Sequence, residues 1–225
     1  MENGVVVKND SFPYSLGVRL FSEFSGTFIL CLSILVVSSG NLAGDFGSLV
    51  VSIVLMLLIY SLAKFSQAHF NPVVTIVFWM RGYCEPSVVP KYILSQITGA
   101  IMASFVSSQI SSINQSKLHF SMDLHTAFLA EIAFTFALIL TIIFVATNPK
   151  TEGNSYYGFA IALVVFLGAT FVGQYSYASF NPAVSSSLFS FGIINSNGLI
   201  MHFLAQFIAG ILAVQAFKAT HTIGG

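Results

Sequence analysis

The feature that most constrains this chain is a six-residue phrase that occurs twice, once in each half. AHFNPV spans residues 68–73, and ASFNPA spans residues 178–183, 110 positions later. Both copies contain Asn followed by Pro. Asn is a favoured helix N-cap, and Pro is tolerated at the first helical position, where its missing N–H costs nothing. We therefore predict two short helices, over about 71–80 and 181–191. The two boxes comprise Asn71, Pro72, Val73, Asn181, Pro182 and Ala183.

The composition predicts an integral membrane protein. Charged residues make up 7% of the chain and hydrophobic residues 56%, and the mean hydropathy is +0.86. A soluble domain carries about 25% charged residues, a difference too large for a big core to explain. The lipid bilayer is therefore the expected environment. The formal net charge is zero and there is no basic cluster, so nothing favours nucleic acid as a partner.

Six segments are long enough to cross a bilayer, which requires about 20 residues each. The third is the least apolar, because it contains several Ser and Gln residues, and we expect it to face protein or an aqueous path. The two short helices at the Asn-Pro boxes cannot span, so we predict that they enter from opposite faces as re-entrant half-helices. The predicted spans are 16–39, 46–66, 90–112, 124–147, 157–177 and 198–218.

The repeat extends beyond the boxes. A Glu-x-x-x-Thr phrase that starts at Glu23 recurs at Glu131, and a phrase that starts at Gln96 recurs at Gln206. Each half then has three spans and one half-helix, and an odd number of spans inverts one half relative to the other. We predict an all-α membrane protein with six transmembrane helices and two re-entrant half-helices. The inverted repeats cover about 16–112 and 124–218 of a single domain, 1–225.

The basic residues predict the orientation. If the N-terminus is cytoplasmic, seven of the eight Lys and Arg residues fall on the inner side or at its boundary, and only Lys117 falls outside. This bias follows the positive-inside rule, so both termini are expected in the cytoplasm. Which membrane holds the protein stays open. The seven inner residues are Lys8, Arg19, Lys64, Arg81, Lys91, Lys150 and Lys218.

The doubled box, the two Glu-x-x-x-Thr phrases and the Ala68-His69 pair give the chain a resemblance to the aquaporins, or major intrinsic proteins, from Glu23 to about Phe217. The resemblance implies a passive channel with one pore per chain, assembled as a homotetramer. It also implies that Glu23 and Glu131 accept hydrogen bonds from the polar backbone of the re-entrant loops. His69 is expected to support its loop. It is not expected to bind a metal, because no second His or Cys stands at ligand spacing.

The same resemblance implies a selection mechanism that physics also supports. Asn71 and Asn181 would direct amide N–H groups into the pore, where a solute oxygen accepts from both. The positive ends of the half-helices would repel cations. Neutral solutes pass, whereas charged ones face the cost of desolvation. No cofactor, metal or catalytic constellation is expected, and therefore no enzymatic activity.

The chain departs from the family at the outer constriction. The position after the second box, where the family usually has Arg, is Val184. With Val51, Ala169 and Ala178 at the other three positions, the filter is predicted to be wide, apolar and uncharged. It would admit glycerol, urea, ammonia, hydrogen peroxide or similar solutes, with water left open. Gln67 and Tyr177 replace residues that are small in the family, and whether they or Lys64 enter the pore is open.

Two other interpretations stay open. The chain is also compatible with a structural or adhesive membrane protein that keeps this fold but conducts poorly. The missing filter Arg is compatible with an ion-leaking pore, because proton and cation exclusion would then rest on the half-helix dipoles alone.

Overall fold

The computed structural model describes residues 13–40, 43–110 and 122–222, and within these ranges the regular structure is entirely helical. Five helices are long and apolar enough to cross a membrane. The segments predicted to span are thus confirmed at five of six positions, with ends shifted by a few residues. The five helices are α1 (Leu16–Gly40), α2 (Gly47–Ser66), α5 (Leu124–Ala146), α6 (Tyr157–Ser176) and α8 (Ser196–Thr222).

The sixth helix, α4 (Val89–Ser108), has the required length of 20 residues but is less apolar. Its polar side chains turn inward, as the sequence predicted: Gln96, Ser104 and Ser107 are buried. Ser104 Oγ donates a hydrogen bond of 2.8 Å to the backbone oxygen of Ser187. Ser104 Oγ and the Gln96 side-chain nitrogen bond to protein, and the buried polar side chains face away from lipid, so a helix of modest hydropathy can lie at membrane depth. The helix ends four residues before the predicted end of the span.

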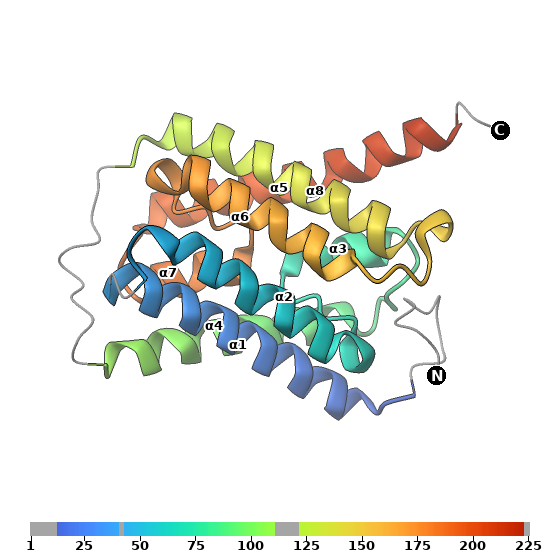
Figure 1. Cartoon of the computed structure of the whole chain (residues 1–225), viewed down its shortest axis with the longest axis horizontal. Helices are drawn as coiled ribbons and strands as arrows, with labels where there is room; N and C mark the ends of the chain where they lie inside the picture. The colour runs from blue at the N-terminus through green and yellow to red at the C-terminus, as the bar shows by residue number, and fades with distance from the viewer. Residues whose placement is uncertain (1–12, 41–42, 111–121, 223–225) are drawn as a thin grey trace.

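The two predicted half-helices are present as α3 (Pro72–Met80) and α7 (Pro182–Ser190), nine residues each. Each ends in a Schellman motif with Gly in the left-handed region, at φ +79° for Gly82 and +88° for Gly192. Glycine adopts this conformation without a Cβ clash, which explains why both half-helices end at equivalent points. Figure 1 shows α3 and α7 toward opposite ends of the molecule.

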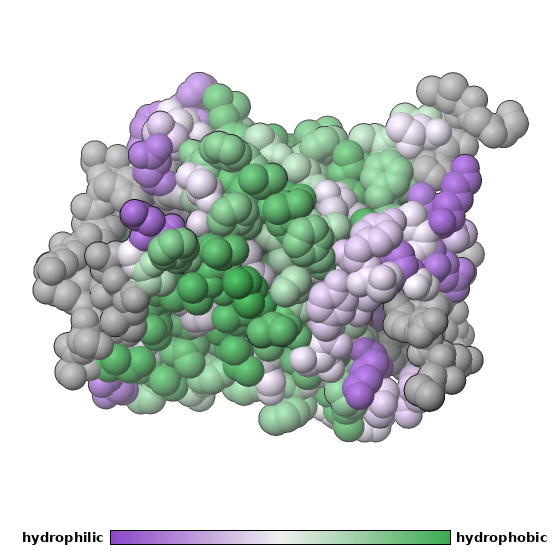
Figure 2. Space-filling model, viewed as in Figure 1, coloured by the Kyte–Doolittle hydropathy of each residue, from purple (hydrophilic) through white to green (hydrophobic). Residues whose placement is uncertain are grey.

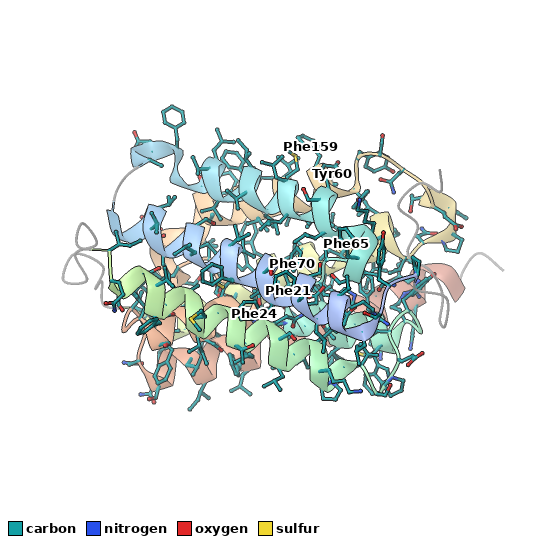
Figure 3. All side chains as sticks on the ribbon, turned by 90° about the horizontal axis from the view of Figure 1, so that it is seen from below. Phe21, Phe24, Tyr60, Phe65, Phe70 and Phe159 are labelled. Carbon is teal, nitrogen blue, oxygen red and sulfur yellow. The ribbon has the colours of Figure 1, made fainter. Side chains whose placement is uncertain are left out.

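The helices form two inverted halves that pack alike. In the first half α1 packs extensively against α4, and in the second α5 packs against α8, while α2 and α6 join the halves. The α1–α4 contact is close at Gly99, where the absence of a Cβ atom permits it. An added Cβ would lie 2.6 Å from the backbone oxygen of Phe24. Small residues let helices approach in this way. In the C-terminal half of α2, Tyr60 donates to the backbone oxygen of Ser155 and accepts from Phe159 N (Figure 3).

The surface matches a membrane environment. Figure 2 shows a hydrophobic band around the middle of the visible face, with hydrophilic residues gathered toward the ends. Large apolar side chains such as Phe21 and Leu94 are 71% and 65% exposed. The start of α1 and the end of α8 lie at the same end of the molecule (Figure 1), as an even number of crossings requires. Lys8 and Lys117, which entered the orientation argument, lie outside the described residues.

Candidate functional site

A cavity of about 1290 Å³ runs along the molecule between the two halves. Tyr14, just before α1, lines one end, and Ser38, near the other end of α1, lines the opposite end. The cavity therefore extends over the length of a membrane-spanning helix. Asn71 and Asn181 line it where α3 and α7 begin. We call the end beside Tyr14 the inner mouth and the end beside Ser38 the outer mouth.

The two box asparagines cap their helices and also connect the two halves. In each box the Asn Oδ1 atom accepts a 2.9 Å hydrogen bond from the backbone N–H two residues later. The Asn71 Nδ2 atom donates to the backbone oxygen of Phe180 at 3.0 Å, and Asn181 Nδ2 donates to that of Phe70 at 2.9 Å. This reciprocal pair adds a contact that the sequence did not predict. An amide has two N–H groups, so each Asn keeps a second donor beside the cavity.

The other box residues pack away from the cavity. Pro72 and Pro182 are the first residues of their helices, as the capping argument predicted. Val73 and Ala183 are buried at 1% and 0% exposure and do not line the cavity. Val73 lies against α8, where a Cβ atom at Gly210 would come within 2.5 Å of Val73 Cγ1. Val73 of the first box, which stands where the second box has Ala183, thus affects the contact between helices and does not form part of the cavity wall.

Glu23 holds the first re-entrant loop by accepting four hydrogen bonds. Its Oε1 atom accepts from the Ser66 hydroxyl at 2.6 Å and from His69 N at 3.0 Å. Its Oε2 atom accepts from Phe70 N and from Gln96 Nε2, both at 2.8 Å. A carboxylate offers acceptors only, so this fully buried side chain matches a site made of donors. The carboxyl group accepts hydrogen bonds from loop N–H groups that lie outside any helix and so have no intrahelical partner.

Glu131 repeats this arrangement in the second half. Its Oε1 atom accepts from Ser176 Oγ and Ser179 N, both at 2.9 Å. Its Oε2 atom accepts from Phe180 N at 2.8 Å and from Gln206 Nε2 at 2.7 Å. The sequence pointed to the glutamates but missed the serines that end α2 and α6. It showed Gln96 and Gln206 only as repeat positions, and their matched spacing was the available signal.

The loops that these carboxyl groups hold are strained. Six residues other than Gly have positive φ angles between 47° and 73°, three in each loop. This region is disfavoured for any residue with a Cβ atom and persists where surrounding contacts determine it. The Ser66 hydroxyl accepts from Ala68 N, and the Ser176 hydroxyl accepts from Ala178 N, both at 3.2 Å. The six residues are Gln67, Ala68, Phe70, Tyr177, Ala178 and Phe180.

His69 is buried beside its loop and contacts protein through both ring nitrogens. Nδ1 lies 3.1 Å from Thr75 Oγ1, and Nε2 lies 3.2 Å from Gln67 Oε1. The second half has Ser179 at the equivalent place and uses His202 of α8, whose Nδ1 lies 3.0 Å from Ser185 Oγ. Sequence reasoning missed His202, and its place four residues before Gln206 was the only signal. Among the described residues no three His, Cys, Asp or Glu side chains could hold a metal ion.

The four residues predicted for the constriction all line the outer half of the cavity, namely Val51, Ala169, Ala178 and Val184. None carries a charge or a ring. Tyr177 lines the same half, and Gln67 and Lys64 line the inner half, so all three side chains whose place was open border the cavity. Among the described lining residues only Lys64 and Glu152 are charged, and the Lys64 ammonium lies 4.8 Å from the centre of the Phe65 ring.

Two inverted helical halves, joined at a doubled Asn-Pro box beside one long cavity, define the chain as a multi-pass membrane protein of a channel-like fold. The sequence profile of the family described as Major intrinsic protein matches residues 15–217, so the chain belongs to that family.

Named relatives agree with this assignment. Probable aquaporin NIP7-1 of Arabidopsis thaliana is 30% identical over 185 residues, covering 77% of this chain and 67% of the relative. Aquaporin NIP3-1 of the same plant is 32% identical over 185 residues, covering 74% and 56%. Aquaporin AqpM of Methanothermobacter marburgensis is 30% identical over 201 residues, covering 75% and 81%. The matched region thus spans only 56–67% of the length of these two plant relatives.

A solved structure has the same fold. The aquaglyceroporin from Plasmodium falciparum superposes with a TM-score of 0.73 over 89% of this chain and 95% of that chain. The sequence identity is 21%, so the likeness concerns the fold.

Proposed function

We propose that the protein is a passive transmembrane channel for small uncharged solutes such as glycerol, urea, ammonia or hydrogen peroxide. One observation carries the proposal: a single cavity reaches both ends of the molecule and has two Asn amides at the point where the half-helices meet. A solute oxygen can accept hydrogen bonds there from the remaining amide N–H groups. Membership of the family supports the same class of activity.

The wall chemistry supports selection against ions. Both half-helices direct their N-termini, the positive ends of their dipoles, toward the middle of the cavity. A cation that loses its hydration shell there meets this field and an apolar wall. No lining residue of the outer half that the structure describes carries a charge, so exclusion of protons and cations depends on the half-helices.

The small outer residues support solutes larger than water. Val51, Ala169, Ala178 and Val184 leave the outer part of the cavity without the Arg that the family usually places there. Solute-selective permeation then depends on width and on the Asn donors. We also propose a homotetramer with one pore in each chain. Mass measurement of the detergent-solubilised protein by light scattering would test it, and a monomer would contradict it.

The activity is tested in proteoliposomes by stopped-flow light scattering. Vesicles are exposed to an impermeant osmolyte and then to glycerol or urea gradients, beside empty liposomes. We expect faster equilibration than in empty liposomes, and a reduction by Val184→Arg, which introduces bulk and charge. Val184→Leu is the matched control, because it adds volume without charge and should reduce flux less.

The same vesicles separate the competing functions. An entrapped pH-sensitive dye reports proton flux, which should stay near that of empty liposomes if the dipoles suffice. Rapid dye response would favour the ion-leaking pore. Fluxes equal to empty liposomes for every solute and ion would favour a structural role of the same fold.

A further inference from the structure

The residue before each box phrase occupies a costly backbone conformation. Gln67 follows α2 with φ +73°, and Tyr177 follows α6 with φ +60°, at equivalent positions of the repeat. Glycine adopts this region without penalty, whereas any side chain is disfavoured. The chain therefore keeps two sizeable side chains where glycine would be least strained. Strain of this kind at a cavity wall is a reason to look for a role of the side chain.

In the first loop, the side chain at this position turns toward the loop and the cavity. Gln67 shows the direction, because its Oε1 atom lies 3.2 Å from His69 Nε2, and both residues line the inner half of the cavity. Tyr177 is the inverted counterpart of Gln67 and lines the outer half. Its backbone is held firmly, with Tyr177 N bonded to Gly173 O at 2.9 Å and the next residue tied to Ser176 Oγ.

Two contacts place these residues near opposite mouths. The ring of Tyr14 lies 4.8 Å from that of Phe65, so the end of α2 lies beside the start of α1 at the inner mouth. Ser48 and Thr170 share a hydrogen bond of 3.0 Å, so the last two turns of α6 lie beside the start of α2 at the outer mouth. Tyr177 follows directly after these turns.

The remaining outer wall consists of aliphatic and small polar side chains. The four constriction positions hold two Val and two Ala, and Gly173 lies one turn before Tyr177 in the same wall. Among the described residues that line the outer half, Tyr177 alone carries an aromatic ring. The side chain is half-buried and packs against the apolar core, so the ring is ordered at the wall.

Resting on the proposed channel function, we infer that Tyr177 is the size-determining residue of the outer mouth. Its ring occupies the space that the four small residues leave, and it sets the largest uncharged solute that passes. The hydroxyl group of Tyr177 is not required for this role, because the effect of the ring is steric. The constriction thus comes from the left-handed residue that ends α6, instead of from a charged residue after the second box.

The test compares Tyr177→Gly, Tyr177→Phe and the parent protein in proteoliposomes. Glycerol, erythritol and xylitol form an uncharged series of increasing size. We expect Tyr177→Gly to raise erythritol permeability relative to glycerol about tenfold, equivalent to a barrier lower by about 1.4 kcal/mol. Tyr177→Phe should keep the size limit of the parent. The Gly variant should remain folded, because Gly suits the left-handed backbone.

Tyr175→Ala is the matched control. Tyr175 lies two residues earlier, is 46% exposed and does not line the cavity, so its loss should leave the size series unchanged. A conducting parent with the same size limit in Tyr177→Gly would overturn the inference and leave the channel function intact. Flux in the Gly variant alone would support the narrowing role and overturn the parent's channel function. Absence of flux in parent and variants would overturn both.

Discussion

At the scale of single residues, the loop-supporting glutamates are the most demanding positions. Glu131 accepts four hydrogen bonds at 2.7–2.9 Å and is fully buried. Each oxygen accepts two of these bonds, so replacing one oxygen would leave two donors without a partner. A buried donor without a partner costs about 1–3 kcal/mol. The carboxyl group is therefore what lets the chain keep a strained, polar loop at membrane depth.

Glu131→Gln should destabilise the protein by about 2–4 kcal/mol, because one acceptor oxygen becomes an NH₂ group that faces two donors. Thermal unfolding in detergent measures the change. Glu152→Gln is the control, since Glu152 is an exposed acid in the loop after α5 and should unfold like the parent. Equal unfolding temperatures for Glu131→Gln and the parent would show that the carboxyl does not hold the loop.

The loop cysteine should be chemically quiet. Cys84 is 5% exposed, and burial raises the pKa of its thiol to about 11. Only the thiolate reacts, so at pH 7.4 less than about one molecule in a thousand is in the reactive form. Maleimide labelling of the folded protein should be slow at pH 7.4 and accelerate as pH rises.

The contrast for this labelling is Ala169→Cys, which introduces a thiol at the cavity wall. That variant should react within the time in which the parent stays unlabelled. Rapid labelling at neutral pH that persists in Cys31→Ala, which leaves Cys84 as the chain's one thiol, would mean that Cys84 is accessible after all.

At the scale of helices, close packing inside each half decides stability. The α1–α4 contact requires Gly99, because an added Cβ would lie 2.6 Å from the Phe24 backbone oxygen. Near the middle of the molecule in Figure 3, the Phe70 ring occupies the space beside Gly26 of α1. These contacts position the loops before the boxes, so helix packing and cavity shape depend on each other.

Gly99→Ala should destabilise the protein by about 1–3 kcal/mol, the usual cost of overpacking. Backbone must shift to admit the methyl group, since the opposing atom belongs to the main chain. Gly17→Ala is the comparison, because the nearest atom to an added Cβ there is 4.0 Å away and Ala favours the helix. Unfolding temperatures should fall for the first and hold or rise for the second.

At the scale of the whole molecule, the arrangement of charges predicts the orientation in the membrane. The start of α1 and the end of α8 lie at one end, and the inner mouth of the cavity opens there. Arg19, Lys64 and Arg81 belong to segments at this end, and Arg81 donates to the Thr147 backbone oxygen at 3.2 Å. Basic residues gathered at one end favour its placement in the cytoplasm.

Both termini should therefore be cytoplasmic. Epitope tags placed at either end of the full chain should be protected from antibody in intact cells and exposed after permeabilisation. A tag introduced between α5 and α6 should behave like the termini, because that loop shares their end. Accessibility of either terminal tag in intact cells would contradict the charge argument.

Much of the fold was predictable from sequence, because its signals are local. Apolar runs mark the spans within a few residues, and the Asn-Pro steps mark the starts of α3 and α7. The helix α4, which is less apolar than the other five spanning helices, was expected to face protein or an aqueous path, and its Gln96 and Ser104 are buried in protein. The missed supporting residues, among them Ser176 and His202, have no signal of their own, since Ser and His are common in unrelated roles.

The sequence by itself determined the helices, their caps and the repeat, because hydrophobicity and capping act over a few neighbouring residues. Only the tertiary structure decided how the halves meet. The bonds between Asn71 and the Phe180 backbone, and between Asn181 and that of Phe70, join positions about half the chain apart. The left-handed backbone at Tyr177 depends on tertiary structure through Ser176, whose hydroxyl accepts from Ala178 N and donates to Glu131 of α5. Such contacts exist only once both inverted halves have packed.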